Sequence, residues 1–280
     1  MEEEILKAIE LAISHEIEAR RTYMSLADES DDLELKRILE EIAHEEAGHE
    51  AALKSRLRLY KEKSLLRDTI SRYVSPQMCA DILANPDMLQ LGGQRRKVTV
   101  LFADIAGFTA LSEQMEPEKV VEVLNAFFTE MVDLVFQHQG TLDKYFGDAL
   151  MAEFGVPVEI PGAASQAVAC ALAMHRRLQE MREKGLTPIQ KMRIGINTGE
   201  AIVGNIGSAK RMDFTVIGDV VNVAARLQEM SKEVDADILV SEATYREVDG
   251  KLGFQALPPV VLRGRREPTM VYRLLAGDQK

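Results

Sequence analysis

Two aspartates in the C-terminal two thirds of the chain have the residue type and position of metal ligands. Asp104 follows the apolar run VTVLFA, and Asp148 lies in the Gly-Asp turn of KYFGDALMAEF. Two carboxylates that meet at one point can hold a pair of magnesium ions about 3.5–4 Å apart, which neutralise phosphate charge and activate a hydroxyl group. An aspartate beside a glycine turn is also a common local hydrogen-bonding residue. Each aspartate alone is therefore weak evidence for a metal site, and the two become stronger evidence together with the other polar residues of this region.

Asn222 and Arg226 lie four residues apart in DVVNVAARL, so a helix places them on one face. The simpler interpretation is a polar pair that faces solvent. The same spacing suits an amide that orients a sugar and a guanidinium group that takes up charge on a phosphate.

The first 60 residues carry polar groups on faces that a helix normally buries. Glu16 and Tyr23 lie seven residues apart on the apolar stripe of the first segment, and Glu46 and His49 continue the stripe of the second. Counted from Ser30, Glu16 is 14 residues back and Glu46 is 16 forward, so an antiparallel hairpin brings them to the same depth. Such groups need protons, a cation or each other when they are buried. The alternative is a narrower stripe that leaves them in solvent.

The elements that position these groups follow from the hydrophobic pattern. Residues 2–28 and 33–60 are predicted to be helices, since they are rich in Glu, Leu, Ala and Ile and contain no proline. The polar run at 28–32 is the predicted turn, and such a short turn makes the helices antiparallel neighbours. Residues 61–97, which include Pro76 and Pro86, are predicted to form a connector with a short coiled coil.

After residue 97 the pattern changes to strands that alternate with helices. The predicted order is a strand at 98–105, a helix at 117–138, a strand pair at 140–155, a helix at 163–184, a second strand pair at 191–207, a helix at 219–232 and closing strands. Interleaving of this kind makes an α/β sandwich. We therefore expect an α+β multidomain protein with boundaries at 1–60, 61–97 and 98–280.

Composition limits the partners of the chain. Its formal net charge is −11, and residues 1–60 hold 16 acidic and 8 basic side chains, which argues against nucleic acid as a partner. No window approaches the roughly 20 apolar residues of a membrane helix, and the N-terminus does not read as a signal sequence. The sequence thus predicts a cytoplasmic protein that does not bind membranes. Cys79 and Cys170 form no metal-binding spacing.

Four motifs in the C-terminal region carry a family resemblance: VTVLFADIAGFT, LDKYFGDALMAEFG, MRIGINTG and FTVIGDVVNVAARL. In this order and spacing they resemble the catalytic domain of the class III nucleotidyl cyclases over residues 95–275. The resemblance implies a ferredoxin-like α/β sandwich that is active as a homodimer, with sites built from both subunits. It also implies a phosphorus–oxygen lyase activity that uses two Mg²⁺ or Mn²⁺ ions per site.

The same resemblance assigns roles to individual residues. Metal ligands are expected to be Asp104, Asp148 and the backbone of Ile105; the phosphate-cradling loop runs from Ile105 to Thr109 and includes Gly107 and Phe108; Arg193 and Arg265 meet the triphosphate; Asn222 orients the ribose and Arg226 stabilises the transition state; Lys144 and Thr215 read the base. In this family lysine with threonine accompanies adenine, whereas guanylate cyclases usually place glutamate and cysteine there. The expected reaction is therefore conversion of ATP to 3′,5′-cyclic AMP and pyrophosphate by an adenylate cyclase.

A second resemblance covers the hairpin. ISHEIEARRTYMSLA followed by ILEEIAHEEAGHEAAL is similar to the ferritin-like, rubrerythrin-type di-iron proteins. A di-iron carboxylate site takes a Glu from each of two helices and a Glu-x-x-His from each of the other two, so one hairpin holds half a site. The resemblance implies a four-helix bundle of two chains, with a di-iron centre held by Glu16, Glu46 and His49 of each and with Tyr23 behind the ligands. Whether the native metal is iron or manganese stays open.

The other polar residues of the second predicted helix are assigned less specifically. Glu41 and Glu45 stay unranked as further ligands, whereas His44 and Glu50 are expected to face solvent. The main functional hypothesis is an adenylate cyclase regulated by an iron, oxygen or redox sensor. In one alternative, the hairpin is only a structural dimerisation module of a constitutive cyclase. A third, less favoured hypothesis is an iron oxidase or storage protein with a secondary cyclase domain.

Overall fold

The computed structural model describes residues 2–70, 91–208, 210–248, 252–261 and 267–275. The chain divides into two compact units, Met1–Tyr73 and Val74–Lys280. None of the described helices has an apolar stretch long enough to cross a membrane.

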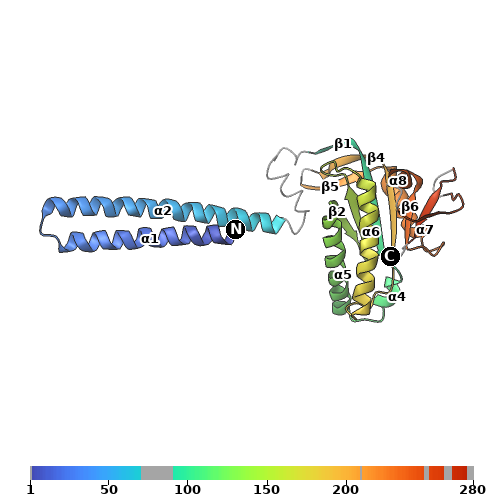
Figure 1. Ribbon diagram of the computed structural model, residues 1–280, viewed down its shortest axis with the longest axis horizontal. Helices are drawn as coiled ribbons and strands as arrows, with labels where there is room; N and C mark the ends of the chain where they lie inside the picture. Colours follow the sequence, from blue (N-terminus) through green and yellow to red (C-terminus); the bar gives the residue numbers. More distant parts are fainter. Residues whose placement is uncertain (1, 71–90, 209, 249–251, 262–266, 276–280) are drawn as a thin grey trace. The chain divides into compact units, whose positions relative to one another are not determined.

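The N-terminal unit is an antiparallel pair of long helices, α1 (Glu2–Glu29) and α2 (Leu33–Ile70), as Figure 1 shows. The Asp32 carboxylate caps α2, since Oδ1 accepts hydrogen bonds from the backbone N–H groups of Glu34 at 2.9 Å and Leu35 at 3.3 Å. The second helix was predicted to end at residue 60, but it continues to Ile70 because no proline or glycine interrupts the sequence there.

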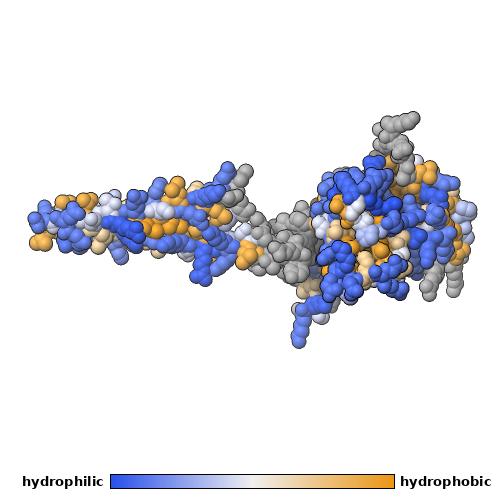
Figure 2. Space-filling view, turned by 90° about the horizontal axis from the view of Figure 1, so that it is seen from below, coloured by the Kyte–Doolittle hydropathy of each residue, from blue (hydrophilic) through white to orange (hydrophobic). Residues whose placement is uncertain are grey.

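The two helices of the hairpin meet along a narrow line of small and branched residues. Ile13, Ala27 and Ala43 are buried on this line. Many larger apolar side chains of the hairpin remain exposed, among them Leu11, Met24, Leu26, Leu33, Leu35, Ile38 and Leu59. Figure 2 shows apolar side chains, in orange, along the visible face of the hairpin. Two helices alone therefore leave many apolar side chains of the hairpin uncovered.

The predicted connector divides between described and undescribed residues. Residues 61–70 continue α2, residues 92–97 belong to the first strand, and residues 71–90, with Pro76, Cys79 and Pro86, lie outside the described residues.

The described residues of the C-terminal unit form a mixed eight-stranded sheet. Its described strands are β1 (Gly92–Ile105), β2 (Gly140–Phe146), β3 (Ala149–Phe154), β4 (Met192–Ser208), β5 (Arg211–Ile217), β6 (Ile238–Ser241), β7 (Phe254–Ala256) and β8 (Val271–Leu274). The described helices are α4 (Phe108–Ser112), α5 (Pro117–Gln137), α6 (Ala163–Glu183), α7 (Asp219–Met230) and α8 (Glu242–Glu247). The strand order is β2-β3-β1-β4-β6-β8-β7, and β5 pairs with β4. The predicted α/β sandwich is confirmed.

Strand β1 separates two apolar cores because its side chains alternate between the faces of the sheet. Leu101 and Ala103 are fully buried in the core that includes α5 and α6, and Figure 1 shows these helices side by side on one face. Val98 and Val100 belong to a second core, with Val220 and Ala224 of α7. Asp104 has the parity of Val98 and Val100, so alternation places it on the α7 face of the sheet.

Helix α7 packs against β4 at a glycine. A Cβ atom built at Gly195 would lie 2.3 Å from the Ala224 carbonyl oxygen and 2.3 Å from the Gln228 nitrogen, both in the backbone of α7. Only a residue without a side chain permits this approach. Gly195 thus sets the distance between the helix and the sheet.

Residues 191–207 were predicted to form a pair of strands, and that prediction is wrong. They belong to one strand, β4, which pairs with β1 without interruption from Met192 opposite Ile105 to Asn205 opposite Gly92. The Asn-Thr-Gly sequence in the middle suggested a turn, but the ladder continues through it, so tertiary pairing overrides local turn propensity. The hairpin partner of β4 is β5 instead.

Gly195→Ala is expected to lower the free energy of unfolding by about 1–3 kcal/mol, because the added methyl group must push α7 away from the sheet. Urea unfolding of the full chain, followed by circular dichroism, measures this loss. Gly199→Ala in the same strand is the matched control, since its Cβ would meet Val220 Cγ2 at an ordinary 3.5 Å. An equal effect of the two substitutions would contradict the close-approach argument.

Candidate functional sites

The two aspartates meet near the end of β1. Asp104 is half-buried, and burial followed by the charge of Asp148 raises the pKa of Asp104 to about 6. Gln228 Nε2 on α7 donates a hydrogen bond to Asp104 Oδ2 at 3.1 Å, and Arg193 lies opposite Asp104 in the β1–β4 ladder. Asp104 and Asp148 are adjacent carboxyl groups, and a divalent cation would neutralise the negative charge that they carry when ionised. The residues present therefore fit the expected Mg²⁺ or Mn²⁺ site.

Gln228 is a site residue that the sequence analysis missed. It lies on the same helix as Asn222 and Arg226, but its amide belongs to the carboxylate group instead of the outward pair. Its spacing could have indicated this role, because Gln228 lies four residues after the buried Ala224 and therefore on the same face of α7.

The loop after β1 turns into the short helix α4. Ile105 is buried at the end of the strand, and the Ala106 N–H donates to the Lys191 carbonyl oxygen at 2.9 Å. Gly107 is exposed and adopts the left-handed region, with φ 74°, which favours glycine. Phe108 packs against the α5/α6 core, while Thr109 is exposed. The core thus fixes the loop at both ends and leaves Gly107 and Thr109 at the surface.

The residues expected to read the base lie together at a second place. Lys144 Nζ on β2 donates to Thr215 Oγ1 on β5 at 3.5 Å, and it also forms an ion pair with Asp143 Oδ1 at 3.2 Å. Thr215 Oγ1 donates to Asp143 Oδ2 at 2.5 Å. The structure therefore brings together the predicted pair, Lys144 and Thr215, and adds Asp143, which the sequence analysis did not single out.

Helix α7 presents the predicted catalytic pair. Asn222 is exposed and Arg226 is half-buried, one turn apart on the helix. Arg265, the second residue expected to meet the triphosphate, lies outside the described residues. Within the described part of the chain, no hydrogen bond or ion pair joins the Asp104–Asp148 group to Lys144, Thr215 or Arg226. One chain thus carries the expected site residues in separate groups.

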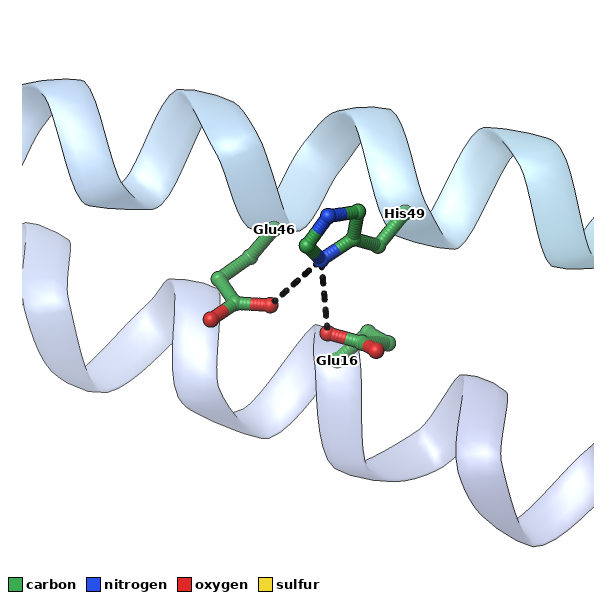
Figure 3. Close-up of side chains that lie close together, drawn as sticks. All are labelled: Glu16, Glu46 and His49. Carbon is green, nitrogen blue, oxygen red and sulfur yellow. Dashed lines mark ion pairs between the residues drawn. The ribbon is translucent and has the colours of Figure 1, made fainter.

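A third group lies in the hairpin, where α1 and α2 face each other (Figure 3). His49 Nδ1 lies 3.4 Å from Glu46 Oε2 and 3.9 Å from Glu16 Oε2. One ligand atom from each of the three residues lies within 4.8 Å of the others, the spacing of groups that can share a metal ion. The structure therefore brings together the three predicted ligands from both helices.

The electrostatics of this group also suit a cation. A hydrogen bond with Glu46, followed by partial burial, raises the pKa of Glu16. The negative charge of Glu46 adds to the same rise, and a bound cation would offset this repulsion between the two carboxylates. Glu16 and Glu46 retain 25% and 20% of their side-chain exposure, whereas His49 retains 65%. The imidazole side of the group is thus open to solvent in the single chain.

One polar residue of the hairpin, Glu50, differs from the prediction in its burial. Glu50 was expected to face solvent, but it is buried, and it pairs with Arg20 Nη1 at 3.0 Å and with Lys54 Nζ at 2.5 Å. The hydrogen bond from Lys54 lowers the pKa of Glu50. The sequence pattern missed this because the partners lie on two helices.

Four further positions complete the comparison with the prediction. His44 is exposed as expected, and Tyr23 is half-buried in α1. Glu41 and Glu45 are exposed, and the described three-residue ligand group includes neither of them.

Comparison with known proteins agrees with the motifs. The sequence profile of the "Adenylate and Guanylate cyclase catalytic domain" matches residues 93–276, and that of "Rubrerythrin" matches residues 7–82. Adenylate cyclase 1 of Rhizobium meliloti is 36% identical over 185 residues, which are 65% of this chain and 28% of that protein. The chain thus spans less than a third of the length of this relative.

Solved structures of both nucleotide specificities are similar to the C-terminal unit. The adenylyl cyclase CyaB from P. aeruginosa is 35% identical, with a TM-score of 0.61 over 68% of this chain and 98% of that one. The guanylyl cyclase Cya2 is 36% identical, with a TM-score of 0.59 over 66% of this chain and 94% of that one. The near-equal similarity to an adenylyl and a guanylyl cyclase leaves the base to be decided by the site itself. The chain belongs to the adenylate and guanylate cyclase catalytic domain family, with a rubrerythrin-like helical hairpin before the catalytic domain.

Proposed function

We propose that the protein is a homodimeric adenylate cyclase that converts ATP to 3′,5′-cyclic AMP and pyrophosphate. The observation that carries this proposal is the pair of adjacent carboxyl groups, Asp104 and Asp148, which lie within the residues that match the cyclase catalytic domain. The choice of ATP rests on Lys144 and Thr215, which contact each other at 3.5 Å.

Each group then has one task in the reaction. Asp104 and Asp148 would hold two divalent cations, which when bound neutralise triphosphate charge and lower the pKa of the ribose 3′-hydroxyl. The loop around Gly107 cradles the phosphates, Asn222 orients the ribose and Arg226 takes up negative charge as the α-phosphate is attacked. The 3′-oxygen displaces pyrophosphate in line, which closes the cyclic phosphodiester.

The separation of the site groups within one chain supports a shared active site. Asp104 and Asp148 of one protomer would meet Lys144, Thr215 and Arg226 of its partner. A two-fold axis makes two such sites per dimer.

Asp104→Asn is expected to lower cyclic AMP formation by at least about a thousandfold, since it removes a metal ligand. It is also expected to raise the melting temperature of the metal-free protein at pH 7. Because the pKa of Asp104 is raised from 3.8 to about 6, ionisation destabilises the folded state as the pH rises through this window, and the loss is complete above it. The exposed Asp133→Asn on α5 serves as the control, with neither effect expected. Undiminished product would contradict the metal assignment.

A mixed dimer of Asp104→Asn and Arg226→Ala chains tests the shared site. Each homodimer should be inactive, but the heterodimer should recover about half of the wild-type activity, because one of its two sites combines the intact groups of both chains. Co-expression with two affinity tags isolates the heterodimer for assay. If each chain formed its site alone, both chains of the heterodimer would be inactive and no activity would be recovered. An inactive heterodimer would therefore contradict the shared site.

We further propose that two hairpins form a four-helix bundle with a di-iron centre. Glu16, Glu46 and His49 from each of two chains would supply six ligands. The exposed apolar side chains of the hairpin and the open side of His49 support a partner hairpin on this surface. When bound, iron would supply one-electron chemistry and reactivity toward oxygen.

Regulation follows if the bundle differs between its metal or oxidation states. A bound ligand shifts an equilibrium only by its differential affinity for two states, so the bundle must favour one arrangement of the cyclase dimer in one state. The competing proposal keeps the cyclase and makes the hairpin a dimerisation module without a sensory role.

The purified wild-type protein is expected to contain about two iron ions per dimer. The double variant Glu46→Ala with His49→Ala is expected to contain none, because it lacks two of the three proposed ligands. Metal analysis measures this loss. Glu40→Ala with His44→Ala changes the same residue types on the exposed side of α2 and should retain the iron. Cyclic AMP formation is then compared in the apo, ferrous and air-oxidised wild type. Equal activity in the three forms would leave the dimerisation module as the role of the hairpin.

A further inference from the structure

Behind Lys144 and Thr215 lies a carboxylate that neither the motifs nor the family roles account for. The Asp143 side chain retains 1% of its exposure, so it cannot contact substrate directly. One oxygen, Oδ2, accepts the Thr215 hydroxyl at 2.5 Å, and the other, Oδ1, faces Lys144 Nζ at 3.2 Å. A buried carboxylate therefore holds both residues that are proposed to read the base.

A β-bulge in β2 creates this arrangement. The β2–β3 register shifts between Leu142 opposite Ala152 and Lys144 opposite Met151, so Asp143 is the extra residue. Regular alternation would place Asp143 and Lys144 on opposite faces of the strand. The bulge instead lets consecutive side chains act on one side, which is why Asp143 can reach both Lys144 and Thr215.

The hydrogen-bond inventory of Thr215 then decides what it can offer a ligand. A threonine hydroxyl has one hydrogen to donate and two lone pairs that accept. The hydrogen goes to Asp143, and one lone pair accepts from Lys144 Nζ at 3.5 Å. The remaining lone pair can only accept a hydrogen bond. An ammonium group has three hydrogens, one of which goes to Thr215, so Lys144 can still donate to a ligand while its charge pairs with Asp143 Oδ1 at 3.2 Å and Asp213 Oδ2 at 3.9 Å.

We propose that Asp143 is a specificity-determining positioning residue, which selects adenine over guanine by fixing the Thr215 hydroxyl as a hydrogen-bond acceptor. This inference rests on the proposed cyclase function and deepens it. The 6-position of adenine carries an amino donor, whereas that of guanine carries an oxygen acceptor. An acceptor at Thr215 beside a donor at Lys144 matches the amino group and the ring nitrogen of adenine. Guanine would place its O6 against the Thr215 lone pair.

A second buried acid, Glu153, lies beside Asp143. It is fully buried on β3, and its burial, followed by the charge of Asp143, raises the pKa of Glu153 well above its ordinary value. Burial thus favours the neutral form of Glu153. Asp143 accepts from the Thr215 hydroxyl and has the Lys144 ammonium 3.2 Å from its other oxygen.

Asp143→Asn tests the inference in the full-length protein. The single acceptor oxygen of the new amide is drawn to the Lys144 ammonium, which turns the NH₂ group toward Thr215 and frees the hydroxyl hydrogen to donate outward. The probes are 3′-deoxy-ATP and 3′-deoxy-GTP with Mg²⁺, which lack the attacking hydroxyl and cannot be cyclised. Titration calorimetry should show wild-type preference for the adenine nucleotide, and the variant should reduce this preference about tenfold. The ratio of kcat/KM for ATP and GTP should fall in parallel, mainly through KM.

Thr141→Val is the matched control, because Thr141 is another buried polar residue of β2 but donates to the Val156 carbonyl oxygen at 2.7 Å and not to Thr215. It should leave the preference unchanged. In a Thr215→Val background, Asp143→Asn should add no further change in preference, since the hydroxyl that it reorients is absent.

The outcomes separate this inference from the cyclase proposal. An unchanged preference in a folded Asp143→Asn protein, or a wild type that binds both probes equally, would overturn the role of Asp143. A wild type that forms no cyclic AMP would overturn the cyclase proposal even where the binding preference responds as expected. If Asp143→Asn does not fold, the same titrations are made with Asp143→Asn plus Glu153→Gln, in which two amides replace the buried carboxyl pair.

Discussion

The close contact between helix α7 and strand β4 at Gly195 is the constraint on which the catalytic unit depends. It holds the α7 backbone against the sheet, so Gln228 reaches Asp104 at 3.1 Å while Asn222 stays exposed. The same alternation of β1 that buries Leu101 and Ala103 under α5 and α6 directs Asp104 to the α7 face. The position of Asp104 is thus a consequence of core packing. A rotation of the strand that moved Asp104 to the other face would expose its apolar neighbours.

Periodicity and motif spacing predicted much of this arrangement. The two long helices, the sheet with its helices and the meeting of Glu16, Glu46 and His49 followed from patterns that extend over many residues, where several positions agree. The hairpin register was predictable because a short turn fixes the depth of every residue on both helices. The groups around Asp104 and around Lys144 followed from motifs instead, since no local pattern shows which strands become neighbours.

The features that the sequence did not predict depend on contacts between distant segments. Glu50 was predicted to lie at the surface because its ion-pair partner Arg20 is on the other helix, far away in the sequence. The continuity of β4 depends on its ladder with β1, which overrides the turn propensity of its own residues. Asp143 was not predicted because a bulge is a mismatch between two strands, and neither strand shows it alone.

The bulge at Asp143 also bears on how nucleotide preference could be redesigned. Because Asp143 lies beneath the residues that would touch the base, an exchange of Lys144 and Thr215 alone would leave a buried negative charge arranged for the original pair. A carboxylate introduced at position 144 would face that charge at close range. Conversion of such a pocket is therefore a problem of three or four coupled positions, and the backbone register of β2 is one of the parameters that a designer must preserve.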